Sequence, residues 1–146
     1  MTVNNIILDT CFWRAIYDPK DDYYDSAQHI SDIYVDKPAY KILVPYPTMY
    51  ELLRTEFVKN KANINALDNF LKKECIEKVC DEPYRDRAIE LSLNNNKRNL
   101  SIVDNLLRLM LEDTDLQIDG IVTFNVGDFI DVCKKRDIIL INNRNY

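Results

Sequence analysis

The sequence predicts an α/β protein, a three-layer α/β/α sandwich with a central, mainly parallel sheet. Two observations carry this prediction. Short, continuous apolar segments alternate with longer segments of helical periodicity, and strands that alternate with helices form right-handed crossovers and a parallel sheet covered on both faces. At 146 residues the chain has the length of one domain, and neither a repeat nor a linker divides it. We therefore expect residues 1–146 to form a single domain.

The strands are predicted from their apolar composition and from the residues that end them. The first candidate, residues 5–8, ends at Asp9, and the second, residues 42–44, is stopped by Pro45. Residues 121–124 and 138–141 have the same composition, and residues 76–79 form a weaker candidate. Short runs that are apolar throughout are typical of strands buried on both faces, as in a parallel sheet.

The helices are predicted from apolar residues at helical spacing. Pro47 stands where a first helical turn begins, and the apolar spacing continues from there to Phe57. Further helices are expected over residues 64–71, around residues 88–91, and over residues 23–34. Ser101 and Asp104 have the spacing of a capping box that opens a helix with an apolar stripe through residue 111.

The composition excludes several classes of protein. With two glycines, the chain has no phosphate-binding glycine loop of the P-loop or Rossmann type. Four cysteines without a C-x-x-C pair, and one histidine, do not form a familiar zinc set. The N-terminus lacks the pattern of a signal peptide, and no apolar run is long enough to span a membrane. We therefore expect a cytoplasmic protein without a membrane partner.

Four acidic residues are placed where a binding site is expected. Asp9 and Asp128 follow predicted strands, while Glu51 and Asp104 lie in the first turns of predicted helices. Ligands of open α/β sheets bind beyond the carboxyl ends of the strands, so these acids can converge. Clustered carboxylates repel each other unless a cation lies between them, and Mg²⁺ or Mn²⁺ prefers such oxygen ligands. A bound divalent ion suits the hydrolysis of a phosphodiester.

The segments that carry these acids resemble, in their order and spacing, the motifs of PIN-domain nucleases. They are Ile6-Ile7-Leu8-Asp9-Thr10, Tyr50-Glu51-Leu52-Leu53, Leu100-Ser101-Ile102-Val103-Asp104 and Thr123-Phe124-Asn125-Val126-Gly127-Asp128-Phe129. The resemblance implies a PIN-like five-stranded parallel sheet and an Mg²⁺- or Mn²⁺-dependent endoribonuclease. It makes Asp9, Glu51 and Asp104 the three core metal-binding acids. Small bacterial members are often VapC-type toxins of toxin–antitoxin modules, so it also implies RNA as substrate, a cognate antitoxin as partner and a homodimer.

The sequence departs from the family pattern at the fourth acidic position. The family often has an acid two residues after the motif threonine, where this chain has Asn125. Asp128, three residues later, has a counterpart in many members and is expected to supply the missing charge. Asn125 remains a candidate metal ligand through its carbonyl oxygen, or a residue that orients a water molecule.

Each acid also has a structural interpretation. Asp104 can cap its helix and pair with Arg108 four residues later; Glu51 can be a solvated residue, and Asp128 a turn residue. Asp9 is harder to explain this way, because a carboxylate at the end of a buried strand is unfavourable without a partner. The alternative function is a catalytically silent PIN-like module that binds RNA or protein, and Asn125 favours it. A third option, an aspartyl-phosphate on Asp9, fits poorly, since Cys11 stands where such enzymes carry a second aspartate.

Overall fold

A single five-stranded parallel sheet organises the molecule. The computed structural model describes residues 4–94 and 98–146, so residues 1–3 and 95–97 of the predicted domain lie outside the description. The strands are β1 (Asn5–Leu8), β2 (Lys41–Pro45), β3 (Ile76–Val79), β4 (Gly120–Val122) and β5 (Ile139–Ile141). Their order in the sheet is β3-β2-β1-β4-β5, and every pairing is parallel. The predicted α/β/α sandwich and its five strands are confirmed.

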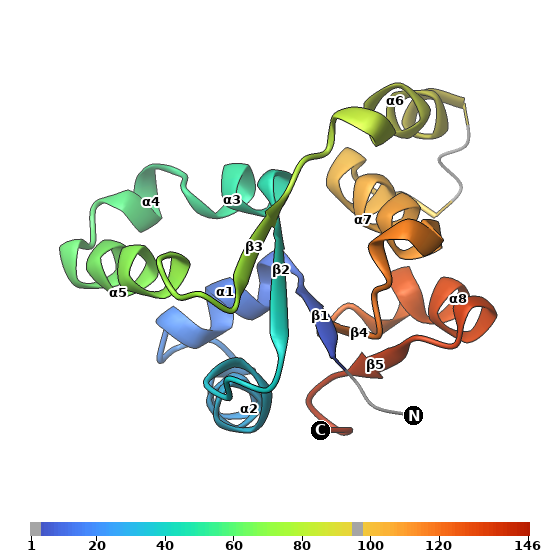
Figure 1. Cartoon of the computed structure of the whole chain (residues 1–146). Coiled ribbons are helices and arrows are strands. Elements are labelled where there is room, and N and C mark those ends of the chain that lie inside the picture. Colours follow the sequence, from blue (N-terminus) through green and yellow to red (C-terminus); the bar gives the residue numbers. More distant parts are fainter. Residues whose placement is uncertain (1–3, 95–97) are drawn as a thin grey trace.

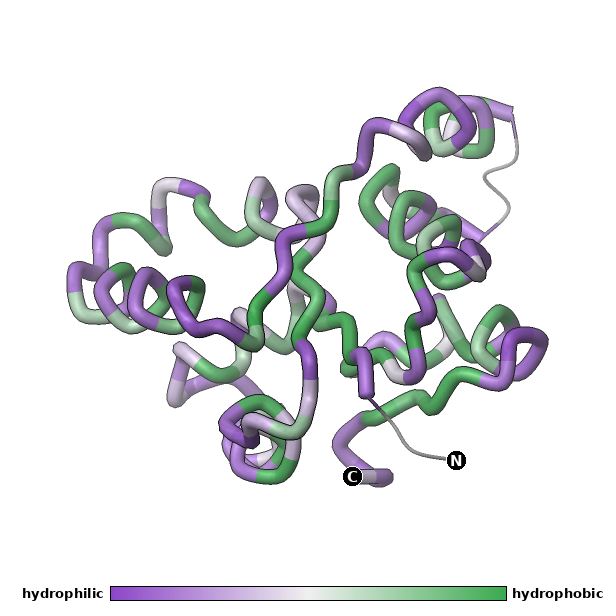
Figure 2. The backbone as a smooth tube through the Cα atoms, in the orientation of Figure 1, coloured by the Kyte–Doolittle hydropathy of each residue, from purple (hydrophilic) through white to green (hydrophobic). Residues whose placement is uncertain are grey.

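Both faces of the central strands β1, β2 and β4 are buried, which explains why these strands are apolar along most of their length, whereas the edge strand β3 exposes Glu77 and Lys78. Along β1, Ile6 and Leu8 point into one core cluster and Ile7 into the other. This alternation follows from the two-residue period of a strand, which sends successive side chains to opposite faces. Figure 2 shows the resulting concentration of hydrophobic backbone positions along the strands and on the helix sides next to them.

Helices cover each face of the sheet (Figure 1). One face carries α1 (Thr10–Tyr17), α2 (Tyr24–Ile30), the π-helical turn η1 (Ser31–Val35), α3 (Tyr46–Leu52), α4 (Thr55–Val58) and α5 (Lys61–Leu71). The other carries η2 (Glu82–Tyr84), α6 (Arg85–Asn94), α7 (Ile102–Glu112), η3 (Thr114–Leu116) and α8 (Val126–Arg136). Within the described residues, no helix is both long and apolar enough to cross a membrane.

The structure corrects several predicted elements. Helices α1 and α8 were not predicted from the sequence. The single helix expected from Pro47 to Phe57 is divided into α3 and α4, because Leu53 leaves the helical conformation with ψ of 47°. The helix expected over residues 23–34 is α2 followed by η1. The strand expected over residues 121–124 is β4, which ends at Val122, so Thr123 and Phe124 belong to the connection into α8.

The topology defines where a ligand would bind. From β1 the chain moves outward to β2 and β3, whereas β4 and β5 lie on the other side of β1. The helices that follow β1 and β4, α1 and α8, therefore lie on opposite faces of the sheet. Such a reversal leaves a crevice beyond the carboxyl ends of the two strands, which is the usual ligand position in open α/β sheets.

Candidate functional site

Asp9 lies in this crevice and is held by four contacts. Its backbone N–H donates to the Val122 carbonyl at 3.0 Å, which extends the pairing of β1 and β4 by one residue. Its Oδ1 accepts the N–H of Thr10 at 2.7 Å, so Asp9 is the N-cap of α1. Its Oδ2 accepts the Thr123 hydroxyl at 2.8 Å and the Cys11 thiol at 3.4 Å. The carboxylate is therefore fixed by the ends of both central strands.

Burial changes the acidity of Asp9. The residue is 4 % exposed, and burial raises its pKa to about 6, while the hydrogen bonds from Thr123 and Thr10 act in the opposite direction. The charge of Asp104 raises the pKa slightly further. At neutral pH, Asp9 is thus a buried carboxylate whose contacts are dipoles and not a cation, and this arrangement favours the binding of one.

Glu51 reaches the same place from α3. Its Oε1 accepts the hydroxyl of the buried Thr10 at 2.5 Å. Because Thr10 follows Asp9 directly, this bond fixes Glu51 next to the crevice. The hydrogen bond argues against the interpretation of Glu51 as a solvated surface residue, and Thr10 is its positioning partner.

Asp104 has the structural role that its spacing predicted. Ser101 and Asp104 form a reciprocal capping box, in which the Asp104 N–H donates to the Ser101 hydroxyl and Asp104 Oδ2 accepts the Ser101 N–H, each at 3.1 Å. The predicted pairing with Arg108 is wrong, since Arg108 binds Asp131 of α8. The cap does not remove Asp104 from the site: its charge raises the pKa of both Asp9 and Asp128.

Asp128 lies in the first turn of α8, beside two arginines. Burial and the charge of Asp104 raise its pKa, and the charges of Arg98 and Arg108 partly offset this. Arg108 donates to the Asp128 carbonyl at 2.7 Å and pairs with both carboxylate oxygens of Asp131, at 2.7 and 2.8 Å. Arg98 also pairs with Asp131, at 3.2 Å. These bonds attach the start of α8 to α7 and fix the position of Asp128.

Asn125 and Thr123 connect the start of α8 to Asp9. The Asn125 N–H donates to the Thr123 hydroxyl at 3.1 Å, and that hydroxyl donates to Asp9. The Asn125 side chain is exposed and does not cap α8. Thr123 is fully buried, and its bond to Asp9 shows that it orients the carboxylate as well as packing in the core.

The structure therefore brings the predicted acids to one end of the sheet, but not into a closed cage. In residues 4–94 and 98–146, no three His, Cys, Asp or Glu side chains are grouped tightly enough to hold a metal ion as they stand. The donor set still fits Mg²⁺, which retains several waters and needs only one or two protein carboxylates besides substrate phosphate. The repulsion that Asp104 exerts on Asp9 and on Asp128 also fits a cation among these acids.

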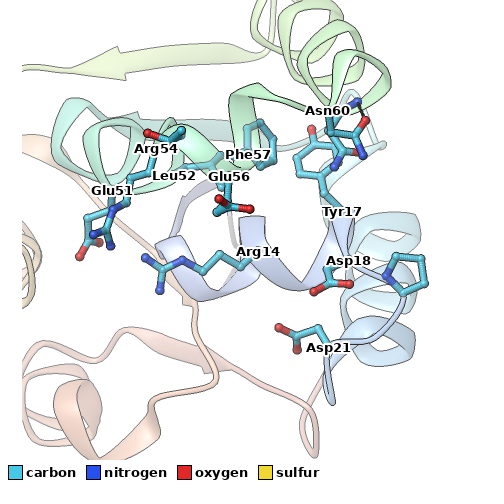
Figure 3. Close-up of a pocket in the computed structure, with 13 residues that line it drawn as sticks. Arg14, Tyr17, Asp18, Asp21, Glu51, Leu52, Arg54, Glu56, Phe57 and Asn60 are labelled. Atoms are coloured by element: carbon cyan, nitrogen blue, oxygen red, sulfur yellow. Dashed lines mark hydrogen bonds between the residues drawn. The ribbon is translucent and has the colours of Figure 1, made fainter.

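Sequence reasoning did not identify the basic and aromatic surroundings of the acids. Beside Glu51 lies a hollow of about 770 Å³ (Figure 3), which we call the Glu51 hollow, with Arg14, Tyr17, Arg54, Phe57 and Asn60 among its lining residues. A second hollow of about 450 Å³, the Asn125 hollow, is lined by Cys11, Arg14, Lys20, Tyr23, Phe124 and Asn125 among others. Arg14 would have been a candidate had α1 been predicted, because it lies on the same helix that Asp9 caps.

Comparisons with known proteins place the fold. No protein-family model matches the sequence, and no curated protein matches it either. Among solved structures, VapC20 of Mycobacterium tuberculosis, a toxin that cleaves the sarcin–ricin loop, is similar with a TM-score of 0.65 and 16 % identity, over 84 % of this chain and 92 % of that one. A chain of VapBC2 from Rickettsia felis, solved bound to a DNA fragment of its promoter, is similar with a TM-score of 0.53 and 17 % identity, over 94 % and 98 % of the two chains. The chain has the PIN-domain fold of VapC-type toxins.

Proposed function

We propose that this chain is a metal-dependent endoribonuclease, and that it acts as the toxin of a toxin–antitoxin module. One observation carries the proposal: a buried carboxylate, Asp9, stands at the switch point of a VapC-like fold beside further acids. The similar VapC20 is a toxin that cleaves the sarcin–ricin loop. The similarity is low in sequence, so the activity rests on the residues of this chain.

Each residue of the site has a proposed role. Asp9, Asp104, Asp128 and Glu51 would hold Mg²⁺ or Mn²⁺, and Asn125 is a further candidate ligand. When bound, such an ion lowers the pKa of a water molecule and neutralises charge that develops on the phosphate. Thr123 keeps the Asp9 carboxylate in one orientation, and Thr10 does the same for Glu51. Fixed ligands of this kind reduce the rearrangement needed when substrate arrives.

The partners follow from the same proposal. The substrate is RNA, and an antitoxin encoded alongside would inhibit the enzyme, because one of the similar structures belongs to a VapBC complex. A homodimer, a cytoplasmic location and the extent of the nuclease domain over residues 1–146 stay predictions from the sequence.

The first experiment is cleavage of a sarcin–ricin stem-loop RNA by the purified protein, with Mg²⁺ or Mn²⁺ and with EDTA. We expect cleavage that needs the metal and that falls at least roughly 100-fold in Asp9→Asn, since even residues behind the metal ligands contribute about 10- to 100-fold. Asp32→Asn is the matched control, because Asp32 is an exposed aspartate on η1 and is not one of the proposed metal ligands. Equal cleavage by the wild type and Asp9→Asn would contradict the proposal.

A second candidate function is a catalytically silent module that binds RNA or protein. Two observations favour it: the site has Asn125 in place of an acid, and the described acids do not form a tight cluster. Asn125→Asp separates the two functions. An increase in metal-dependent cleavage supports the nuclease with a limiting charge. No cleavage by either protein, together with no divalent-metal binding by calorimetry, supports the silent module.

A further inference from the structure

Arg14 lies at the boundary between two hollows, one lined by Glu51 and the other by Asn125. It is one of the residues that line both the Glu51 hollow and the Asn125 hollow. It lies on α1, on the turn after the residues that contact Asp9 and Glu51. A strand that passes from one hollow to the other runs beside Arg14 and also beside Asp21, the second residue common to both linings.

Among the described residues, the Arg14 side chain has no intramolecular partner that would compete with a ligand. It is exposed, and within the described ranges neither an ion pair nor a side-chain hydrogen bond engages it. By contrast, Arg85, Arg98 and Arg108 are each paired with an aspartate. Arg54 adds a second cation to the Glu51 hollow and Lys20 adds one to the Asn125 hollow, and carboxylates line both hollows as well: Asp18, Asp21, Glu51 and Glu56 in the first, Asp21 and Asp22 in the second. A planar guanidinium without a partner is well suited to bind a phosphate with two parallel hydrogen bonds.

The charges within the Glu51 hollow give a bound nucleotide an orientation. Figure 3 draws the Arg14 side chain extending toward the side of Glu51, with Asp18 and Asp21 on the other side. Carboxylates line the hollow on both sides, Asp18 and Asp21 on one and Glu51 and Glu56 on the other, so phosphate is attracted only beside an arginine, whereas the amino groups of a base can donate to the carboxylates. The phosphate is thus expected at Arg14 and the base away from it.

Aromatic rings are available in both hollows. In the Glu51 hollow, Tyr17 packs edge-on against Phe57, with ring centroids 5.4 Å apart. In the Asn125 hollow, Tyr23 stacks on Phe124 at 4.5 Å and stays 37 % exposed. Aromatic rings beside cationic side chains are a usual means of binding unpaired bases without strict sequence preference.

We propose that Arg14 binds the phosphate between two consecutive nucleotides of an unpaired RNA strand, whose bases occupy the Glu51 hollow and the Asn125 hollow. The inference rests on the proposed nuclease function and specifies its substrate: the strand at the acids is single-stranded, and Arg14 sets its register. Tyr23 provides the stacking surface for the base in the Asn125 hollow.

The test measures binding of a fluorescent, unpaired ten-nucleotide RNA to the Asp9→Asn protein in Mg²⁺, by anisotropy at several salt concentrations. In this background we expect Arg14→Gln to weaken binding about fivefold at 0.1 M salt and to lower the slope of log K against log salt by about 0.7, the contribution of one phosphate contact on a single strand. Arg136→Gln is the matched control, since Arg136 is an exposed arginine at the far end of α8. Tyr23→Ala is expected to weaken binding at least about fivefold with the slope unchanged.

Three results would overturn the inference: no binding of unpaired RNA, an unchanged slope in Arg14→Gln, or an equal loss in Arg136→Gln. Cleavage of the same RNA by the otherwise wild-type protein tests the nuclease separately. If Arg14 is needed for binding but nothing is cut, the inference stands and the nuclease proposal fails. If cleavage occurs and Arg14→Gln leaves both KM and the salt slope unchanged, the nuclease stands and the inference fails. We expect Arg14→Gln to raise KM and leave kcat unchanged.

Discussion

The two sides of the site hold their carboxylates by different means. Asp9 is fixed at the ends of β1 and β4 by hydroxyl, thiol and amide groups, and it is almost completely buried. Asp128 lies on a helix that is attached to its neighbour through Arg108 and Asp131, at a more exposed position. On the first side the charge of the carboxylate meets no cation among the described residues, whereas on the second side arginines lie nearby.

This difference explains how the site can be stable before it binds a cation. Because Asp9 is removed from solvent, its ionised form is disfavoured in spite of the hydrogen bonds it accepts, and a bound cation would relieve that. The arginines next to Asp128 reduce the repulsion between the acids without entering contact with Asp9. The cost of burying the ionised Asp9 carboxylate therefore lies on the strand side, where metal binding would relieve it. On the helix side, the ion pairs fix the position of Asp128. The three predictions below test this division.

The largest expected effect is on the pH dependence of stability. Because the pKa of Asp9 is raised from 3.8 to about 6, its neutral form favours folding; this stabilisation is complete below 3.8 and is lost as pH rises through about 6, a difference of roughly 3 kcal/mol. In EDTA, Asp9→Asn should therefore exceed the wild type in free energy of unfolding by about that amount near pH 7.5, and match it near pH 4. Urea unfolding across this pH range measures it, with Asp32→Asn as the control. A wild type that is the more stable protein near pH 7.5 in EDTA would contradict the prediction.

A smaller effect is expected from Thr123→Val, which keeps the shape of the side chain and removes the hydroxyl that donates to Asp9. We expect divalent-metal affinity to fall about 10- to 100-fold. The pKa of Asp9 should also rise, because the Thr123 bond lowers it. Calorimetry of Mn²⁺ binding at several pH values measures both. Thr48→Val is the matched control, since that equally buried hydroxyl donates to the Pro45 carbonyl; equal losses in both variants would refute a specific role for Thr123.

The smallest effect is expected on the helix side. Asp131→Asn weakens the ion pairs that attach α8 to Arg108 and Arg98, and because the Asp131 side chain is 52 % exposed, we expect the free energy of unfolding to fall by only about 1 kcal/mol. These ion pairs hold the pKa of Asp131 well below its usual range. The loss of unfolding free energy in Asp131→Asn should therefore be present at pH values above the usual pKa of an aspartate and vanish in acid. Metal affinity at Asp9 should change less than in Thr123→Val. A larger loss of metal affinity in Asp131→Asn would remove the distinction between the two sides.

The fold was predictable where a local pattern corresponds to a tertiary role. Apolar runs identified β1, β2, β4 and β5, because burial on both faces leaves few polar positions in them, and β3, with its exposed Glu77 and Lys78, was the weaker candidate. Helix α1 was missed because its residues 11–13 are consecutive apolar side chains that do not display helical spacing clearly. Helix α8 was missed because its apolar stripe is narrow, with Phe129, Val132 and Cys133 as its buried residues. The break after Leu52 has no proline or glycine to mark it.

The site was predictable as a set of acids and not as a set of contacts. The order of Asp9, Glu51, Asp104 and Asp128 along predicted strands and helices was sufficient to place them at one end of the sheet. The partner of Arg108 was mispredicted because the i, i+4 rule considers only the same helix, and the competing Asp131 lies 23 residues away in the sequence. Contacts such as Thr10 with Glu51 join residues 41 positions apart and depend on the packing of α1 on α3.

The backbone bond from Asp9 to Val122 has a consequence for how the protein responds to heat. The amides of Asp9 and Thr123 donate to the central sheet, to Val122 and Ile141, and so belong to its hydrogen-bond ladder. Amides of this kind exchange with solvent only when the sheet itself opens, whereas the Asp104 amide is bonded to a side chain at a helix start, where fraying suffices. Asp9 thus stays in place as long as the central sheet is folded. On heating, its position should be lost only with global unfolding of the protein.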